Sequence, residues 1–362
     1  MPPTIEQVTE ALSAVVDPNT GKDVVSGEAL RNVRVDGDLV SFDVVLGYPA
    51  ASQVDPIRRA VVAAAQALPG VGRVAANVYQ KIEAHGVQRG MRSLPNVRNI
   101  IAVASGKGGV GKSTTAVNIA LALAAEGASV GVLDADIYGP SQPTMLGISG
   151  KPETRDGKSL EPMLGHGIQA SSIGFLIDPD TPMVWRGPMV TQALEQLLRE
   201  TNWRDLDYLI VDMPPGTGDI HLTLAQKIPV TGAVIVTTPQ DIALLDARKG
   251  LKMFEKVGIP ILGIVENMAI HICSNCGHAE HVFGAGGGQK MAADYGVEYL
   301  GGLPLDIRIR EQTDSGRPTV VAEPDGEIAE TYRRIARRMA VSLGQQSRDA
   351  PVKHPTIVFQ KS

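Results

Sequence analysis

The residues with the clearest chemical meaning lie in one glycine-rich segment that contains two lysines. Residues 106–114 read GKGGVGKST and match the pattern GxxxxGK[ST]. An apolar run, Ile100–Ala104, precedes the segment, and an expected helix, Thr115–Ala125, follows it. In this context the glycines let backbone N–H groups surround a phosphate, and the helix N-terminus adds its positive end. The sequence therefore predicts a nucleotide site made of Gly106, Lys107, Gly108, Gly109, Val110, Gly111, Lys112, Ser113 and Thr114.

Two side chains of this segment and one distant acid are expected to handle the phosphates. Lys112 can pair with the β- and γ-phosphate oxygens, and Ser113 offers a hydroxyl to Mg²⁺. Asp212 follows the apolar run Tyr208–Val211 and is the acid expected to hold the water shell of the metal. These residue types at these positions predict a protein that binds ATP together with Mg²⁺.

The chain has two cysteines, Cys273 and Cys276, in a turn-rich segment. Two thiols supply half of the four thiolates that a [4Fe-4S] cluster prefers, so two copies of the chain would complete such a site. A single Zn²⁺ held by both cysteines with His278 and His281 is a second arrangement, although the histidine spacing is tighter than usual. A redox dithiol and an unliganded pair remain as further alternatives.

These residues need a scaffold, and the pattern from Asn99 onward supplies one. Short apolar runs typical of strands buried on both faces alternate with segments of helical length. The expected strands are Ile100–Ala104, Ser129–Leu133, Tyr208–Val211, Ala233–Thr237 and Ile261–Val265. We therefore expect an α/β domain over residues 99–345, with a doubly wound, mostly parallel sheet, and a loosely held tail over 346–362.

A smaller unit precedes this domain. A helix over Thr4–Val16, a strand over Leu39–Leu46, a helix over Gln53–Leu68 and a strand over Arg73–Tyr79 predict a small α+β domain over residues 1–84. Gly37 is placed in a hairpin turn before the first strand. The segment 85–98 has no hydrophobic period and is expected to be a linker.

Charge and hydropathy exclude some classes of binding partner. A formal net charge of −5 and a pI near 5.8 argue against nucleic acid as a partner. The chain shows neither a signal-peptide pattern nor a run of about 18 apolar residues, so we expect no membrane partner and a cytoplasmic location. Four arginines, at positions 333, 334, 337 and 338, are expected to form a solvated helix face.

The segment GKGGVGKS resembles the deviant Walker A motif of the nitrogenase iron protein, MinD, ParA and arsenite-pump ATPases. The resemblance implies slow ATP hydrolysis in a homodimer, in which Lys107 reaches the nucleotide of the partner. Asp134-Ala-Asp136 resembles switch I of this group, which implies that Asp134 lies near the metal and that Asp136 positions the attacking water. The segment Asp212–Asp219 resembles switch II.

A closer resemblance is to the Mrp/ApbC iron-sulfur cluster carriers over about residues 95–345. It rests on GKGGVGKSTT, DADIYGPS, DMPPGTGD, VENM followed by CxxC, and LGGLPLD. It implies a homodimer that holds a [4Fe-4S] cluster between the Cys273 and Cys276 pairs, receives it from cluster assembly machinery and passes it to apoproteins. Adenine contacts at Asn267, Pro304 and Asp306 are implied as well.

The N-terminal unit resembles the small domain of iron-sulfur assembly factors. It departs from them at Gly47–Ala50, where standalone relatives usually carry a cysteine. Without that cysteine, the role expected of this unit is partner docking or regulation. Two rival classes are a MinD- or ParA-like positioning ATPase and an ATPase with a structural zinc site. Metal analysis would separate the three classes. Iron and sulfide per dimer would indicate the carrier, zinc per monomer the ATPase with a zinc site, and neither the positioning ATPase.

Overall fold

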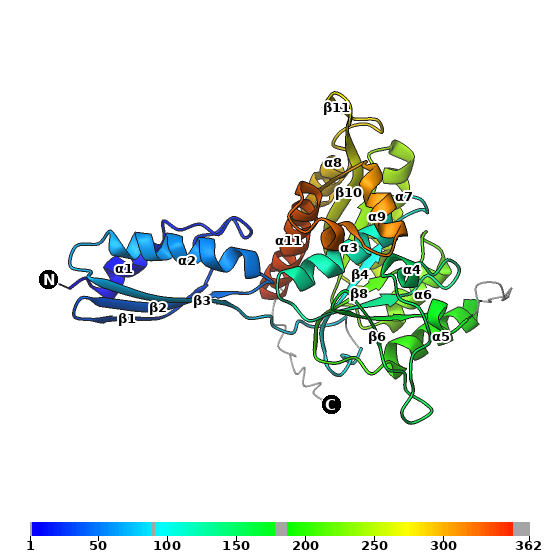
Figure 1. Cartoon of the computed structure of the whole chain (residues 1–362), viewed down its shortest axis with the longest axis horizontal. Helices are drawn as coiled ribbons and strands as arrows, with labels where there is room; N and C mark the ends of the chain where they lie inside the picture. Colours follow the sequence, from blue (N-terminus) through cyan, green and yellow to red (C-terminus); the bar gives the residue numbers. More distant parts are fainter. Residues whose placement is uncertain (1, 89–90, 178–186, 350–362) are drawn as a thin grey trace, which may run out of the picture.

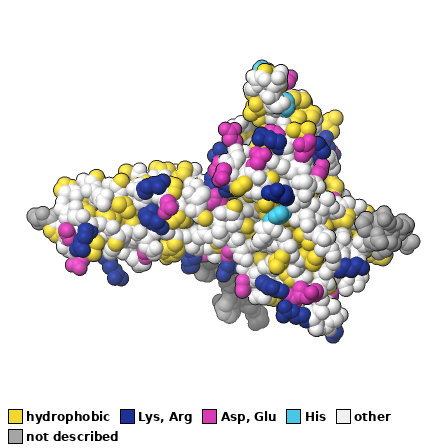
Figure 2. Space-filling model, in the orientation of Figure 1, with side chains coloured by type: hydrophobic (Ala, Val, Ile, Leu, Met, Phe, Trp, Pro, Cys, Tyr) yellow, Lys and Arg dark blue, Asp and Glu magenta, His cyan; other side chains and the backbone are white. Residues whose placement is uncertain are grey.

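The computed structural model describes residues 2–88, 91–177 and 187–349. Figure 1 shows two parts of unequal size. A slender N-terminal unit projects from a larger domain, and the two meet beside helices α3 and α11. Figure 2 shows side chains of both charge signs scattered over the visible face of both parts.

The N-terminal unit is a three-stranded sheet covered by helices. Its elements are α1 (Ile5–Leu12), β1 (Leu30–Asp36), β2 (Leu39–Leu46), α2 (Ala51–Gln66) and β3 (Arg73–Gln80), and the strand order is β1-β2-β3. β1 and β2 form an antiparallel hairpin, whereas β2 and β3 run parallel because α2 connects them. Alternate residues of β2 are buried, as the sequence pattern predicts. The first helix is shorter than predicted, since the chain turns after Leu12.

The larger domain contains the remaining elements. Its strands are β4 (Val97–Ala104), β5 (Val130–Asp134), β6 (Met163–Gly165), β7 (Ile168–Ser172), β8 (Leu206–Asp212), β9 (Gly232–Thr237), β10 (Ile261–Ile272), β11 (Ala279–Glu280) and β12 (Tyr299–Pro304). Its helices are α3 (Lys112–Ala125), α4 (Gln142–Met145), η1 (Ile173–Phe175), α5 (Gly187–Glu200), α6 (Asp219–Lys227), α7 (Asp241–Lys256), α8 (Gly287–Tyr295), α9 (Ile307–Asp314), α10 (Thr319–Ala322) and α11 (Glu327–Asp349).

These strands form one mixed sheet in the order β11-β10-β9-β4-β8-β5-β7-β6, with β12 also paired to β10. The pairs among β4, β5, β7, β8, β9, β10 and β12 are parallel, and only the pairs of β6 and β11 are antiparallel. Helices α3 and α11 pack on one face, and α5, α6 and α7 pack on the other. The doubly wound, mostly parallel sheet expected from the sequence is confirmed.

Two elements of the larger domain extend well beyond their predicted ends. β10 does not end at Val265 but continues to Ile272, because residues beyond Val265 find partners in β12 and β11. The last helix, α11, continues to Asp349 rather than ending before a tail at residue 346. The longer β10 ends directly before Cys273, so the first cysteine follows this strand without an intervening loop.

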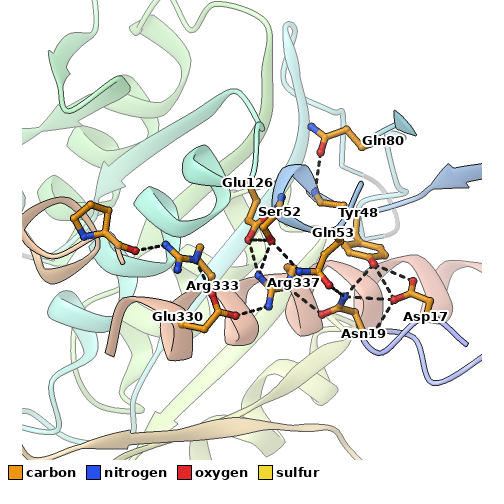
Figure 3. Close-up of polar contacts among 12 residues, drawn as sticks. Asp17, Asn19, Tyr48, Ser52, Gln53, Gln80, Glu126, Glu330, Arg333 and Arg337 are labelled. Carbon is orange, nitrogen blue, oxygen red and sulfur yellow. Dashed lines mark hydrogen bonds and ion pairs between the residues drawn. The ribbon is translucent and has the colours of Figure 1, made fainter. Parts of the chain in front are cut away.

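The expectation of a solvated arginine face on α11 is wrong at Arg337. This side chain is buried and forms an ion pair with Glu126, the residue that follows α3 (Figure 3). Arg333 pairs with Glu330 on the same helix. Sequence periodicity could not show this, because the partner of Arg337 is 211 positions away along the chain.

Phe254 tests the core on the α7 side of the sheet. Its side chain is fully buried, so Phe254→Ala is expected to lower the free energy of unfolding by roughly 3–5 kcal/mol. Leu245→Ala on the same helix is the matched control, because Leu245 is 55% exposed. Denaturant unfolding followed by circular dichroism measures both variants. Equal losses in the two would contradict the placement of this core.

Candidate nucleotide site and cysteine hairpin

The glycine-rich loop joins β4 to α3, and its shape depends on the positive φ angles and close approaches that its glycines allow. Gly109 and Gly111 have φ angles of +80° and +79°. A Cβ atom on Gly106 would lie 2.1 Å from the backbone of Asp246, and one on Gly111 would lie 2.1 Å from the Asn267 amide. α3 begins directly after this turn and has no side-chain cap, so its first N–H groups remain open to a phosphate.

Lys112, Ser113 and Asp212 come together as the sequence predicts. The buried Lys112 ammonium forms an ion pair with Asp212 and donates to the Ser113 hydroxyl at 3.0 Å. Gln142 donates to the second carboxylate oxygen of Asp212 at 2.9 Å. The lysine and the hydroxyl that would contact phosphate and metal are thus held beside the acid at the end of β8.

Asp134 lies directly opposite Asp212 in the pairing of β5 with β8. Its carboxylate accepts backbone N–H groups of Ser141 and Gln142 at 2.9 and 3.0 Å, and the Ser172 hydroxyl at 3.1 Å. Burial, and then the neighbouring Asp212 charge, raise the pKa of Asp134 to about 7. Two carboxylates this close favour a cation between or beside them.

Asp136 and Lys107 lie nearer to solvent. The Asp136 carboxylate accepts the Gly139 N–H at 3.3 Å, and burial raises its pKa. Lys107 is partly exposed, and its backbone carbonyl accepts the Ser105 hydroxyl at 2.9 Å. Within the described ranges Lys107 takes part in no ion pair, so its ammonium is available to an anion outside this chain.

Unpartnered buried atoms indicate that this site fits a hydrated cation and a phosphate. Ser141 Oγ, Gln142 Oε1 and His221 Nδ1 are buried without a hydrogen-bond partner among the residues that the structure describes. Ser141 and Gln142 donate backbone N–H groups to Asp134, and the Gln142 side-chain amide donates to Asp212, so the orphan amide oxygen of Gln142 lies beside the carboxylate pair. Carboxylates, hydroxyls and amide oxygens are the ligands and water-binding groups that Mg²⁺ prefers.

Sequence reasoning missed two of these residues. Gln142 directly follows the segment DADIYGPS and links Asp134 to Asp212 through its backbone and side chain. His221 is buried on α6, and its Nε2 lies 2.6 Å from the Pro214 carbonyl, to which it donates. Burial lowers the pKa of His221, so the neutral imidazole is favoured. The only sequence signal was the position of both residues just after recognised motifs.

The predicted adenine-side residues lie on β10, on β12 and at the start of α9. Asn267 lies within β10 rather than beyond it, and its side-chain amide donates to the Val110 carbonyl at 2.8 Å. Pro304 ends β12 opposite Ile270, and Asp306 caps α9 by accepting the Arg308 N–H at 2.9 Å. Asn267 therefore fastens the glycine-rich loop to β10.

The two cysteines lie in the hairpin between β10 and β11, at one edge of the sheet (Figure 1). Two backbone hydrogen bonds close the turn. The Cys273 N–H donates to the His278 carbonyl at 2.9 Å, and the Gly277 N–H donates to the Cys273 carbonyl at 2.8 Å. Cys276 is exposed and Cys273 is partly exposed. Hydrogen bonds from the backbone of Asn275 and Cys276 lower the pKa of Cys273, which favours its thiolate.

The hairpin does not assemble the zinc alternative. His281 bonds the Ala269 carbonyl through Nδ1 at 2.7 Å. Across residues 2–88, 91–177 and 187–349, no three His, Cys, Asp or Glu side chains gather in a way that could hold a metal ion.

The position of the thiols also differs from that of a redox dithiol. Thioredoxin-like dithiols lie at a helix N-terminus, whereas these two thiols lie between two strands.

Among the described helices, none is long and apolar enough to span a membrane.

The sheet order, the glycine-rich turn before α3 and the paired acids define a P-loop NTPase. Residues 96–340 match the family model described as NUBPL iron-transfer P-loop NTPase, and residues 5–78 match an iron-sulfur cluster assembly protein. The chain belongs to this family of iron-transfer P-loop NTPases.

Individual relatives agree with this assignment. An iron-sulfur cluster carrier protein of Escherichia coli strain K12 is 50% identical over 351 residues, which cover 94% of this chain and 95% of the relative. One of Pseudomonas fragi is 62% identical over 271 residues, covering 74% and 94%. A nucleotide-binding protein of Archaeoglobus fulgidus, solved with ADP, is 39% identical with a TM-score of 0.56, covering 64% of this chain and 90% of that one.

His221 yields a prediction for hydrolysis. His221→Leu removes the donor to Pro214 and should free the turn after Asp212, lowering kcat for ATP roughly tenfold, or about 1.4 kcal/mol. His221→Gln keeps an N–H donor of similar reach and should recover most of the rate. Steady-state phosphate release measures kcat, and calorimetry should show unchanged ADP affinity. A glutamine variant as slow as the leucine variant would refute this positioning role.

Proposed function

We propose that this chain is an ATP-dependent iron-sulfur cluster carrier that works as a homodimer. Cys273 and Cys276 of two copies hold one [4Fe-4S] cluster, which is the cargo rather than a resident cofactor. Cluster assembly machinery loads the dimer, and apoproteins receive the cluster. Relatives that share 50–62% of their aligned residues with this chain are named iron-sulfur cluster carriers, which supports the proposal.

The nucleotide chemistry in this proposal is slow hydrolysis of ATP to ADP and phosphate. Lys112 binds the β- and γ-phosphates, and Ser113, Asp134 and Asp212 hold Mg²⁺ and its water shell. Mg²⁺, when bound, neutralises charge on the phosphates. Asp136 orients the attacking water, and Lys107 contacts the nucleotide of the partner subunit. Asn267, Pro304 and Asp306 line the adenine side.

The observation that carries the proposal is that one strand joins the two sites. β10 holds Asn267 against Val110 of the glycine-rich loop and continues to Ile272, next to Cys273. The six residue-to-residue steps from Asn267 to Cys273 span at most about 20 Å of extended chain. A shift of the glycine-rich loop on binding nucleotide is therefore transmitted to the base of the cysteine hairpin.

β10 contains a local irregularity between the glycine-rich loop and the cysteine hairpin. The pairing of β10 with β12 shifts register between Glu266 and Ile270, and Met268 has a φ of +57°. A non-glycine residue in this region stores backbone strain and often marks a functional position. We propose that this bulge lets the outer end of β10 reorient while its inner end stays in the sheet.

Anaerobic reconstitution with iron and sulfide tests the carrier function. We expect a brown dimer with one [4Fe-4S] cluster per two chains, measured by visible absorption, iron and sulfide analysis and light scattering. Cys273→Ala and Cys276→Ala should stay colourless, whereas Ser274→Ala in the same hairpin should load normally. A colourless monomer that carries zinc would refute the proposal, and a dimer with neither metal would favour a positioning ATPase.

Asn267 tests the link between the two sites. Asn267→Ala loses the bond to Val110 but leaves both thiols in place, so cluster loading should be unchanged. Cluster transfer to an apoprotein, followed by stopped-flow absorption at saturating ATP, should lose its dependence on nucleotide, as in Lys112→Ala. Transfer by Asn267→Ala that still responds to ATP as the wild type does would contradict coupling through β10.

A further inference from the structure

The N-terminal domain contacts the C-terminal end of α3, which is the end away from the glycine-rich loop. Helix α2 starts without a side-chain cap of its own, because its N-cap residue is Ala50. Glu126, which follows α3, supplies the missing acceptors: it accepts the Ser52 N–H at 2.9 Å and the Ser52 hydroxyl at 2.7 Å, and its carbonyl accepts the Ala51 N–H at 3.2 Å. A carboxylate of one domain thus caps a helix of the other.

Arg337 of α11 completes the junction. It donates to Glu126 at 2.5 Å, to Glu330 at 2.8 Å and to the side-chain carbonyl of Asn19 in the N-terminal domain at 3.0 Å (Figure 3). Arg337 is 4% exposed and Glu126 is fully buried. Because buried charges are costly without their partners, Glu126 needs both Arg337 and the start of α2.

The N-terminal side of the junction is ordered by its own polar contacts. The Asn19 amide donates to the Tyr48 hydroxyl at 3.0 Å and to Gln53 at 3.2 Å, and the Tyr48 hydroxyl donates to Asp17 at 2.9 Å (Figure 3). Gln80, at the end of β3, adds a second grip by donating to the Gly127 carbonyl at 2.9 Å. We name the set Asn19, Ser52, Glu126 and Arg337 the interdomain latch.

The interdomain latch lies beside an open space. A cavity of about 620 Å³ opens beside it, between the N-terminal domain and the end of α11. Asp17, Tyr48 and Lys81 line it from one domain, and Val341 and Gln345 line it from the other. The two domains are therefore separated by open space along this part of their junction.

The latch and the nucleotide site are the two ends of one helix. α3 begins at Lys112 and ends at Ala125, directly before Glu126, and it is buried along most of its 14 residues. A continuous helix of this length is about 21 Å long and moves as a unit. A displacement imposed at Lys112 by a nucleotide is therefore passed to Glu126.

We propose that the interdomain latch makes the orientation of the N-terminal domain depend on the nucleotide bound at the glycine-rich loop. The inference rests on the proposed function only in requiring nucleotide to bind there; it requires neither a cluster nor a dimer. It gives the N-terminal domain, which has no cysteine, a regulatory task. By reciprocity, a partner that binds the N-terminal domain more tightly in one orientation than in the other changes nucleotide affinity.

Hydrogen exchange of the full-length protein, with and without MgADP or MgATP, tests the latch. In the wild type, nucleotide should change hydrogen exchange of the amides of residues 17, 19, 20 and 50–54 several-fold. Arg337→Met should abolish that response. Arg333→Met is the matched control, because Arg333 lies one turn away on α11 and bonds only Glu330 and the Pro324 carbonyl in the described contacts; its response should equal that of the wild type.

A double variant covers the case in which Arg337→Met does not fold. Asn19→Ala with Ser52→Ala removes side-chain contacts from the N-terminal domain and keeps the Arg337–Glu126 ion pair, so the larger domain should bind nucleotide normally. The exchange response should fall several-fold but not vanish, because the backbone N–H groups of Ala51 and Ser52 still reach Glu126. Calorimetry on the same samples separates the two hypotheses. Absent ATP binding would overturn the proposed function, whereas binding without any exchange response in the wild type, or an intact response in the double variant, would overturn the latch.

Discussion

Two carboxylates at the ends of neighbouring parallel strands impose the constraint on which the rest of the site depends. Asp134 and Asp212 lie opposite each other and are both fully buried. Like charges without solvent destabilise one another, so the fold must supply positive charge and hydrogen-bond donors nearby. The glycine-rich turn returns the chain over the strand ends so that Lys112 meets Asp212, and the segment after β5 directs the N–H groups of Ser141 and Gln142 at Asp134.

The same need explains why glycines are required in the loop. Lys112 can reach Asp212 only if the chain passes close to the backbone of α7 and to Asn267, and a Cβ atom at Gly106 or Gly111 would collide with them. Asn267 then holds the loop from β10. Asn267 therefore has two structural roles. It holds the glycine-rich loop that brings Lys112 to the buried acids, and it belongs to β10, the strand that leads to Cys273.

The junction at the other end of α3 follows the same physical rule. Glu126 is buried, and it is compensated by one arginine from α11 and by the first N–H groups of α2. The larger domain contributes both charges and the N-terminal domain contributes the helix start and Asn19, so neither domain alone satisfies every group. This shared satisfaction of buried polar groups helps to hold the base of the N-terminal domain beside the open cavity.

The sequence by itself determined the class of fold, the glycine-rich loop, the acids at the strand ends and the identity of the two thiols. Each of these depends on local spacing or on apolar runs with a fixed period, which a single chain displays directly. Only the tertiary structure decided that β10 runs on to the cysteine hairpin, that Gln142 links Asp134 to Asp212, and that Arg337 is buried. The reason is that each depends on a partner far away along the chain: β12 and β11 for β10, Asp212 for Gln142, and Glu126 for Arg337. Polarity predicts exposure only until a distant charge of opposite sign makes burial favourable.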